Sequence, residues 1–166
     1  MKVLTGADHD NAMKWLKQAA EVAKEATCLR SRCGAVIVSP HGLNIADGYN
    51  SPPCRVPGQK EVPIVCRKEA VAPNFKSDKT CCVHAEQRAI LKAVEFCPQH
   101  ILGSTLYFIR LDENGNMLKA GKPYCTICSK LALDAGISYF VLWHEEGITV
   151  YDTFEYNELS FQYGKE

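Results

Sequence analysis

The hydrophobic positions divide the first part of the chain into one helical and two extended segments. Residues 10–27 carry apolar side chains at helical spacing, and Asp10 is predicted to cap this helix. The run GAVIVS at 34–39 is short and rich in β-branched side chains, which is typical of a buried strand. A turn at 41–42 leads into a second predicted strand at 44–49.

The second part of the chain continues the alternation. Helical spacing recurs at 83–94 and at 125–136, and a glycine ends the latter pattern. Runs of β-branched and aromatic side chains at 104–109 and 138–143 predict two further strands. Helices that alternate with short apolar strands predict a layered α/β domain.

Two segments interrupt this pattern in a chain that is interpreted as one domain, 1–166. Residues 51–80 hold five prolines and show no clean period, so an irregular insertion is predicted there. Within 54–82, six basic against three acidic side chains leave an excess of three positive charges, which either binds a substrate phosphate or is merely solvated. The tail at 145–166 is acidic and aromatic, and its rings cover a pocket, form a subunit interface or pack in the core.

Composition narrows the functional classes. The 166 residues include 19 basic and 19 acidic side chains, and this neutral total does not suggest a general polyanion binder. The sequence shows no charged-then-apolar leader and no apolar stretch of about 18 residues, so neither secretion nor membrane insertion is predicted and a cytoplasmic location is expected. Nine cysteines in such a chain favour metal binding, chemistry or packing over disulfides.

Two short motifs carry candidate chemistry. His84 in HAE, with Cys125 and Cys128 in CTIC, supplies three ligands suited to zinc, and three protein ligands leave one position for water, as in catalytic sites. The two cysteines open a helix, whose free N–H groups stabilise thiolates. Glu86 lies about 200° around a helix from His84, so the two side chains converge only if the metal lies near the helix N-terminus. Glu86 would then reach the water and not the ion.

At these residues the sequence resembles the zinc-dependent cytidine/deoxycytidylate deaminase superfamily, whose signature is His-x-Glu followed by Pro-Cys-x-x-Cys. The segments SRCGAVIV at 31–38, DGYNSPP at 47–53 and HAEQRAI at 84–90 are most similar to the deoxycytidylate (dCMP) deaminase branch. The resemblance covers about residues 10–144. It implies a three-layer α/β/α fold around a mixed five-stranded sheet.

The resemblance also implies a hydrolytic activity, most similar to the conversion of dCMP to dUMP with release of ammonia. One catalytic zinc would activate water, and Glu86 would carry protons from that water to the ring nitrogen and to the leaving amine. By the same resemblance, Asn50 would hydrogen-bond the sugar, and the backbone around Ala85 would contact the base edge.

One departure from the signature concerns the turn before the second motif. The family's proline directly precedes the first cysteine, whereas Tyr124 here separates Pro123 from Cys125. The zinc ligands are intact, so the departure bears on the substrate pocket, and Tyr124 is a candidate substrate contact.

The remaining cysteines leave a second metal open. Some phage dCMP deaminases carry a second, structural zinc, and Cys28 lies at a matching distance before the GAVIV strand. Cys54 and Cys66 in the insertion could supply further ligands. Alternatively, Cys81 or Cys82 closes the first site as a fourth ligand, or these cysteines are simply small buried hydrophobic residues.

Three functional interpretations remain. The leading one is a deaminase of a free pyrimidine nucleotide, expected to be a homo-oligomer by resemblance, with no nucleic-acid or membrane partner. A related one is deamination of cytidine, guanine, a riboflavin-pathway pyrimidine or adenosine in transfer RNA. The third is a non-catalytic zinc module that uses the deaminase scaffold for interaction, and the intact Glu86 argues against it.

Overall fold

The computed structural model describes residues 1–53, 66 and 82–163. Its central feature is a mixed sheet of seven strands in the order β1-β7-β6-β4-β2-β3, with β5 paired to β4. The predicted number of five strands is too low because β1 (Lys2–Val3) and β5 (Met117–Leu118), of two residues each, are too short to show an alternating pattern.

Antiparallel pairing joins β2 to β3, β2 to β4 and β6 to β7, while β4 and β6 are parallel. The predicted strands agree with β2, β3, β4 and β6 to within two residues at each end, whereas β7 lies in the tail, where no element was predicted. The five longer strands are β2 (Arg32–Val38), β3 (Asn44–Tyr49), β4 (Thr105–Leu111), β6 (Tyr139–His144) and β7 (Gly147–Asp152).

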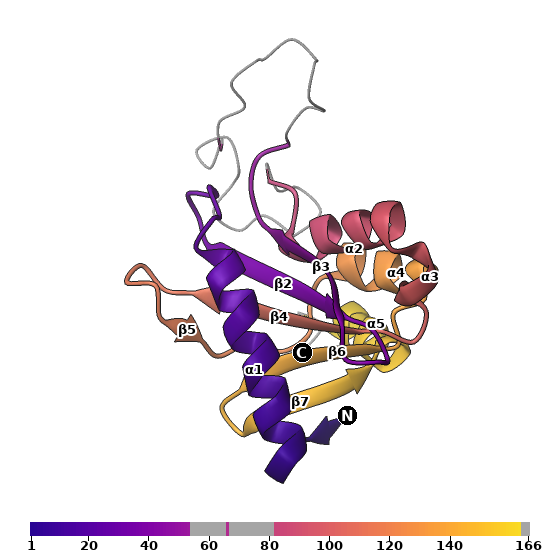
Figure 1. Ribbon diagram of the computed structural model, residues 1–166. Coiled ribbons are helices and arrows are strands. Elements are labelled where there is room, and N and C mark those ends of the chain that lie inside the picture. Colours follow the sequence, from indigo (N-terminus) through magenta and orange to yellow (C-terminus); the bar gives the residue numbers. More distant parts are fainter. Residues whose placement is uncertain (54–65, 67–81, 164–166) are drawn as a thin grey trace.

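Helices cover both faces of the sheet, which gives the expected three layers (Figure 1). Helix α1 (Gly6–Ala23) packs on one face against β2 and β4. Helix α2 (Ala85–Phe96) packs on the other face against β3 and β2, followed by the four-residue α3 (Pro98–Ile101). On that face α4 (Thr126–Ala135) contacts both α2 and α5 (Thr153–Gln162).

The alternation of side chains along β4 separates two hydrophobic cores. Tyr107, Ile109 and Leu111 pack with α1, whereas Leu106 and Phe108 pack on the face that carries α2. Side chains at even positions of β4 therefore face α2 and the motifs that precede α2 and α4.

The observed ends of α1 and α4 show how well apolar periodicity in the sequence predicts helix boundaries. The helix α1 begins at Gly6 with Thr5 at its N-cap, so the prediction that Asp10 caps it is wrong. The first turns of α1 are exposed and carry no apolar period, which hid them from the pattern. The predicted end of α4 is confirmed, because Gly136 adopts a left-handed conformation with φ 85° just after its last residue.

The C-terminal tail contributes to the core through two of its aromatic residues. Tyr151 and Tyr156 are buried in the cluster on the α2 face, so the core-packing interpretation holds for them. Phe154, Phe161 and Tyr163 are exposed. The predicted insertion and its six basic side chains fall outside the described residues, apart from 51–53 and 66. Among the described helices, none is both long and apolar enough to cross a lipid bilayer.

A close approach of backbones fixes α2 on the sheet. A Cβ atom at Gly48 of β3 would lie 2.4 Å from the carbonyl oxygen of Ala85 and 2.5 Å from the backbone nitrogen of Ala89. Both distances are too short for any side chain, so only glycine lets the first turn of α2 rest directly on β3.

Replacing Gly48 by alanine is expected to lower the free energy of unfolding by about 1–3 kcal/mol, because the added methyl group overlaps the α2 backbone. The matched control is Gly121→Ala, where a Cβ atom would meet nothing within 4 Å. Urea unfolding followed by circular dichroism measures both variants. Equal losses of stability in the two proteins would contradict the close packing.

Candidate functional site

The His84 side chain is presented from the residue just before helix α2. His84 has an extended backbone (φ −71°, ψ 154°), and its N–H donates to the Gln87 side-chain oxygen at 3.0 Å. The helix therefore begins at Ala85, two residues later than predicted. The angular separation that a helix imposes does not apply to His84 and Glu86, and both side chains line one cavity.

The two cysteines of the second motif open α4 in the same way. Cys125 occupies the N-cap position and Cys128 lies in the first turn, and both are buried. The Nδ1 atom of His84 lies 3.4 Å from the Cys125 Sγ and 3.3 Å from the Cys128 Sγ. Tetrahedral zinc, with Zn–S of about 2.3 Å and Zn–N of about 2.0–2.1 Å, separates such atoms by about 3.6 Å. The donor set and its geometry therefore fit zinc.

The electrostatics of the cysteine pair favour a metal thiolate. Hydrogen bonding from the Cys128 thiol and the nearby His84 together lower the pKa of Cys125 from 9.0 to about 4, against the opposing effect of burial. The same hydrogen bond and burial raise the pKa of Cys128. The pair thus holds one proton at neutral pH, which a metal ion displaces on binding.

Glu86 lies beside this cluster in the first turn of α2. Its side chain is buried, with 6% of the residue exposed. A carboxylate in such a position contributes nothing to hydrophobic packing. Burial raises the pKa of Glu86, while the nearby His84 opposes that rise. A buried carboxyl group with a raised pKa at the wall of a cavity is suited to accept and return a proton.

The cavity in front of the cluster has a volume of about 220 Å³. The predicted substrate contacts Asn50, Ala85 and Tyr124 all line it, together with His84 and Glu86. The structure therefore brings every predicted site residue into one place, since Cys125 and Cys128 adjoin the same histidine.

The Asn50 side chain forms two hydrogen bonds within the fold. Its side-chain oxygen accepts from the Cys33 N–H at 2.8 Å, and its amide nitrogen donates to the Ser31 carbonyl oxygen at 2.9 Å. These bonds hold the end of β3 against the start of β2. One amide hydrogen and one oxygen lone pair remain for a ligand, so a contact between Asn50 and a sugar stays a prediction.

Tyr124 forms part of the cavity rim. About half of the residue is exposed, 49%, and its ring lies 5.6 Å from the ring of Tyr163 at the end of α5. The inserted tyrosine is thus supported by the C-terminal helix, in a tilted aromatic pair.

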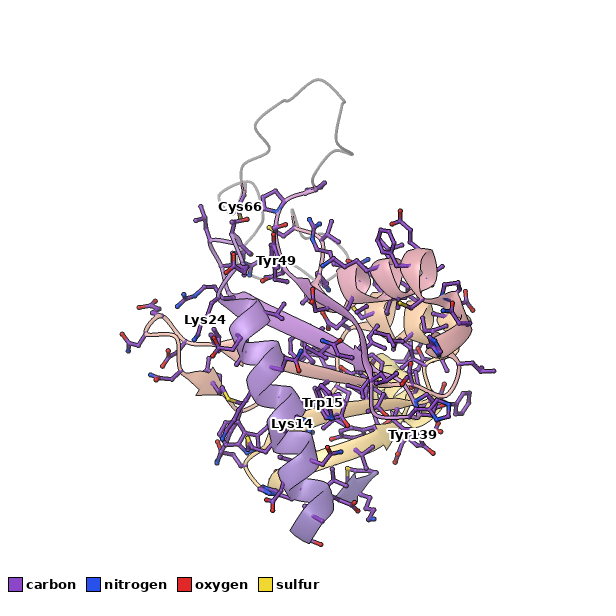
Figure 2. All side chains as sticks on the ribbon, in the orientation of Figure 1. Lys14, Trp15, Lys24, Tyr49, Cys66 and Tyr139 are labelled. Atoms are coloured by element: carbon purple, nitrogen blue, oxygen red, sulfur yellow. The ribbon has the colours of Figure 1, made fainter. Side chains whose placement is uncertain are left out.

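A second group of potential metal ligands adjoins the cavity. The sulfur atoms of Cys28, Cys66 and Cys82 lie within 4.8 Å of one another, with 3.6 Å between Cys66 and Cys82. The backbone N–H of Leu29 donates to the Cys66 sulfur at 3.4 Å. Figure 2 shows Cys66 at the same end of the molecule as Tyr49, the last residue of β3. Cys82 belongs to this group and does not close the His84 cluster, whereas Cys54 and Cys81 lie outside the described residues.

Sequence reasoning missed five residues of the cavity wall: Arg30, Ser31, Cys33, Phe108 and Arg110. The period-two pattern of β4 contained part of the signal, because an arginine two residues after a phenylalanine must share its face of the sheet. The pattern did not show which face carries the site.

The sequence from 9 to 144 matches the family described as "Cytidine and deoxycytidylate deaminase zinc-binding region". The chain belongs to this family. It is a zinc deaminase, since the match spans most of the chain and the His-Cys-Cys cluster has the donors and spacing that zinc requires.

Solved structures show that the deaminase shares its fold with known relatives. The dCMP deaminase of cyanophage S-TIM5 in complex with dCMP and dUMP is 21% identical, with 82% of each chain covered and a TM-score of 0.55. Its apo form is 22% identical over 79% of this chain and 80% of that one, with a TM-score of 0.54. The cytidine deaminase of Burkholderia pseudomallei is 13% identical over 87% and 94%, with a TM-score of 0.57. Among curated protein sequences, none matches this chain significantly.

Replacing Cys125 by serine is expected to remove about one zinc ion per chain, because a neutral hydroxyl is a poor substitute for a thiolate ligand. The matched control is Cys97→Ser at the end of α2, outside both cysteine groups. Metal content measured by mass spectrometry after dialysis against a chelator distinguishes the two. Unchanged zinc in Cys125→Ser would exclude this cysteine as a ligand.

Proposed function

We propose that the deaminase acts on a free pyrimidine nucleotide, dCMP, and converts it to dUMP with release of ammonia. The observation that carries the proposal is the cavity that joins the His84, Cys125 and Cys128 centre to the buried carboxyl group of Glu86. The motifs most similar to the dCMP deaminase branch support it. The fold shared with the S-TIM5 enzyme, which was solved with dCMP and dUMP, is consistent with it.

The reaction requires water to replace the exocyclic amine of the base. The oxygen of water bonds to the ring carbon that carries the amine, the carbon–nitrogen bond breaks, and ammonia leaves a keto group behind. When bound, zinc supplies the Lewis acidity that makes water a competent nucleophile near neutral pH. Glu86 takes the first proton that water loses and delivers it to the ring nitrogen. It then takes the second proton from the same oxygen, now bonded to the ring carbon, and passes it to the leaving amine as the keto group forms.

The position of Glu86 suits this shuttle. It stands beside the ligand cluster, on the cavity wall, so it can reach both the water and the ring. Its burial keeps bulk water from competing for the proton. We further propose that Ala85, whose N–H has no partner within α2 because it begins the helix, contacts the base edge.

The charge of the chain favours a small-molecule substrate over transfer RNA. A transfer-RNA substrate calls for an extended basic surface, whereas the chain has equal numbers of basic and acidic side chains.

Ammonia release from a substrate panel tests the proposal. Among dCMP, CMP, cytidine, guanine and a structured RNA, dCMP is expected to give the highest kcat/KM, because the motifs of the chain are most similar to the dCMP deaminase branch. A coupled glutamate dehydrogenase assay measures the rates. Activity confined to guanine or to RNA would overturn the assignment.

A variant of the carboxyl group separates catalysis from metal binding. Glu86→Gln is expected to lower kcat about 10²–10⁴-fold while retaining zinc, because only proton transfer is lost. Glu95→Gln, on an exposed position of the same helix, is the control and should keep full activity. Wild-type protein that holds zinc but releases ammonia from no substrate would favour the non-catalytic binding module instead.

We also propose that Cys28, Cys66 and Cys82 hold a second zinc with a structural role. The 3.6 Å between the Cys66 and Cys82 sulfurs is close to the roughly 3.8 Å that two thiolates adopt on tetrahedral zinc. Such an ion would tie the segment before β2 to the segment before α2. Cys28 and Cys82 also line the catalytic cavity, so the ion would support its wall.

Cys66→Ser is expected to lower the zinc content from about two ions per chain to about one, because a ligand of only the second group is lost. Its thermal unfolding midpoint should fall as well, since metal binding stabilises the folded state. Cys97→Ser again serves as the control. A wild-type content of one zinc, unchanged in Cys66→Ser, would show that these cysteines are merely packed.

A further inference from the structure

An arginine on β4 faces the catalytic cavity. Arg110 is paired with Cys33 of β2 in the antiparallel register, and it follows Phe108 by two residues. It therefore lies on the face of the sheet that carries α2, and all three residues line the cavity. The thiol of Cys33 interacts electrostatically with both Glu86 and Arg110, so the guanidinium group and the catalytic carboxyl group belong to one site.

A second arginine reaches the same cavity from another segment. Arg30 lies between α1 and β2, and its neighbour Ser31 holds Asn50 through the backbone carbonyl. Beside the cavity opens a shallow hollow of about 580 Å³, and Arg30 and Arg110 line both spaces. The two arginines therefore lie between the catalytic cavity and the hollow.

One of the two acidic side chains that line the hollow, Asp112, is engaged within its own turn. The Asp112 carboxylate accepts two hydrogen bonds from Asn116, at 2.7 Å and 3.0 Å, inside its own turn. Arg32, the third arginine of the hollow, donates to the backbone carbonyls of Asp112 and Glu113. Among the described residues, no carboxylate lies within salt-bridge distance of Arg110. Arg110, exposed and next to the cavity, is therefore available for a ligand anion.

We propose that Arg110, together with Arg30, binds the 5′-phosphate of the substrate and makes the deaminase prefer nucleotides to nucleosides. This inference rests on the proposed function for the placement of the base at the zinc centre. With the ring inside the cavity, the phosphate would extend toward the hollow, which both arginines also line. The planar donor fork of arginine matches phosphate oxygens in pairs, and two such groups balance a phosphate dianion.

Arg30 and Arg110 lie outside the segment whose basic composition suggested a phosphate-binding site. The basic excess at 54–82 pointed to the insertion as a phosphate clasp, but those side chains fall outside the described residues. Arg30 lies in the segment just before β2, and Arg110 lies on β4 opposite Cys33 of β2. The register of the sheet places Arg110 beside Cys33 on the cavity wall, which a charge count along the chain cannot reveal.

Steady-state kinetics of Arg110→Gln with dCMP and with deoxycytidine test the phosphate contact. The variant is expected to raise KM for dCMP about 10–100-fold with kcat within about twofold, and to leave kcat/KM for deoxycytidine unchanged. Arg110→Lys keeps the positive charge but loses the paired N–H donors of the guanidinium group, so its KM for dCMP should lie between those of wild type and Arg110→Gln. The control is Lys130→Gln, an exposed position of α4 with the same loss of charge. Inorganic phosphate should compete with dCMP in wild type and lose that effect in Arg110→Gln.

Calorimetry in the Glu86→Gln background separates this proposal from the proposed function. If Arg110→Gln weakens dCMP binding about 10–100-fold but not deoxycytidine binding, the phosphate contact stands even where no substrate is deaminated. If deoxycytidine and dCMP are deaminated and Arg110→Gln affects both equally or neither, the deaminase stands and the phosphate contact is overturned. Absence of any dCMP binding to the zinc-loaded protein would overturn it as well.

Discussion

The site depends on two helices that begin at the same point in space. His84 and Cys125 are the N-cap residues of α2 and α4, and their side chains approach to 3.4 Å. The first turns of a helix carry unsatisfied N–H groups and the positive end of the helix dipole, which stabilise thiolates and carboxylates. Two such ends together allow Cys125, Cys128 and Glu86 to be buried side by side. Neither helix alone could hold this concentration of ionisable groups.

The sheet determines where those helix ends meet. Gly48 lets α2 lie on β3 with backbone against backbone, so the first turn of α2 has no freedom to slide. Arg88, one turn further along α2, donates to the Ser51 hydroxyl at 2.7 Å and to the Pro52 carbonyl at 2.9 Å. The chain leaving β3 is thereby attached to α2, and Asn50, just before it, is attached to β2. Packing and hydrogen bonding thus position the ligands before any metal arrives.

Sequence analysis succeeded where the signal was local. Ligand types at fixed spacing identified His84 and the two cysteines, and apolar runs located four of the five longer strands, because both signals arise from a few adjacent residues.

Sequence analysis failed where the residues that contact one another are far apart in the chain. Whether Cys82 joins His84 or Cys28 is decided by tertiary structure, since the three cysteines of the second group come from separate segments. The side of the sheet that Arg110 faces could not be predicted either, because it also depends on tertiary structure. The two-residue strands β1 and β5 are defined only by their pairing with β7 and β4, which the sequence pattern does not show.

The second cysteine group and the arginine pair are connected through one short segment. Cys28 lies two residues before Arg30, and Ser31 follows with the carbonyl that holds Asn50. This segment leads from the end of α1 into β2 and belongs to no helix or strand over residues 28–31. A metal on Cys28 would limit its motion and so reduce the entropy lost when Arg30 and Asn50 contact a substrate. Such an ion would contribute to affinity for the nucleotide without touching it, which explains why a structural cluster would form part of the cavity wall.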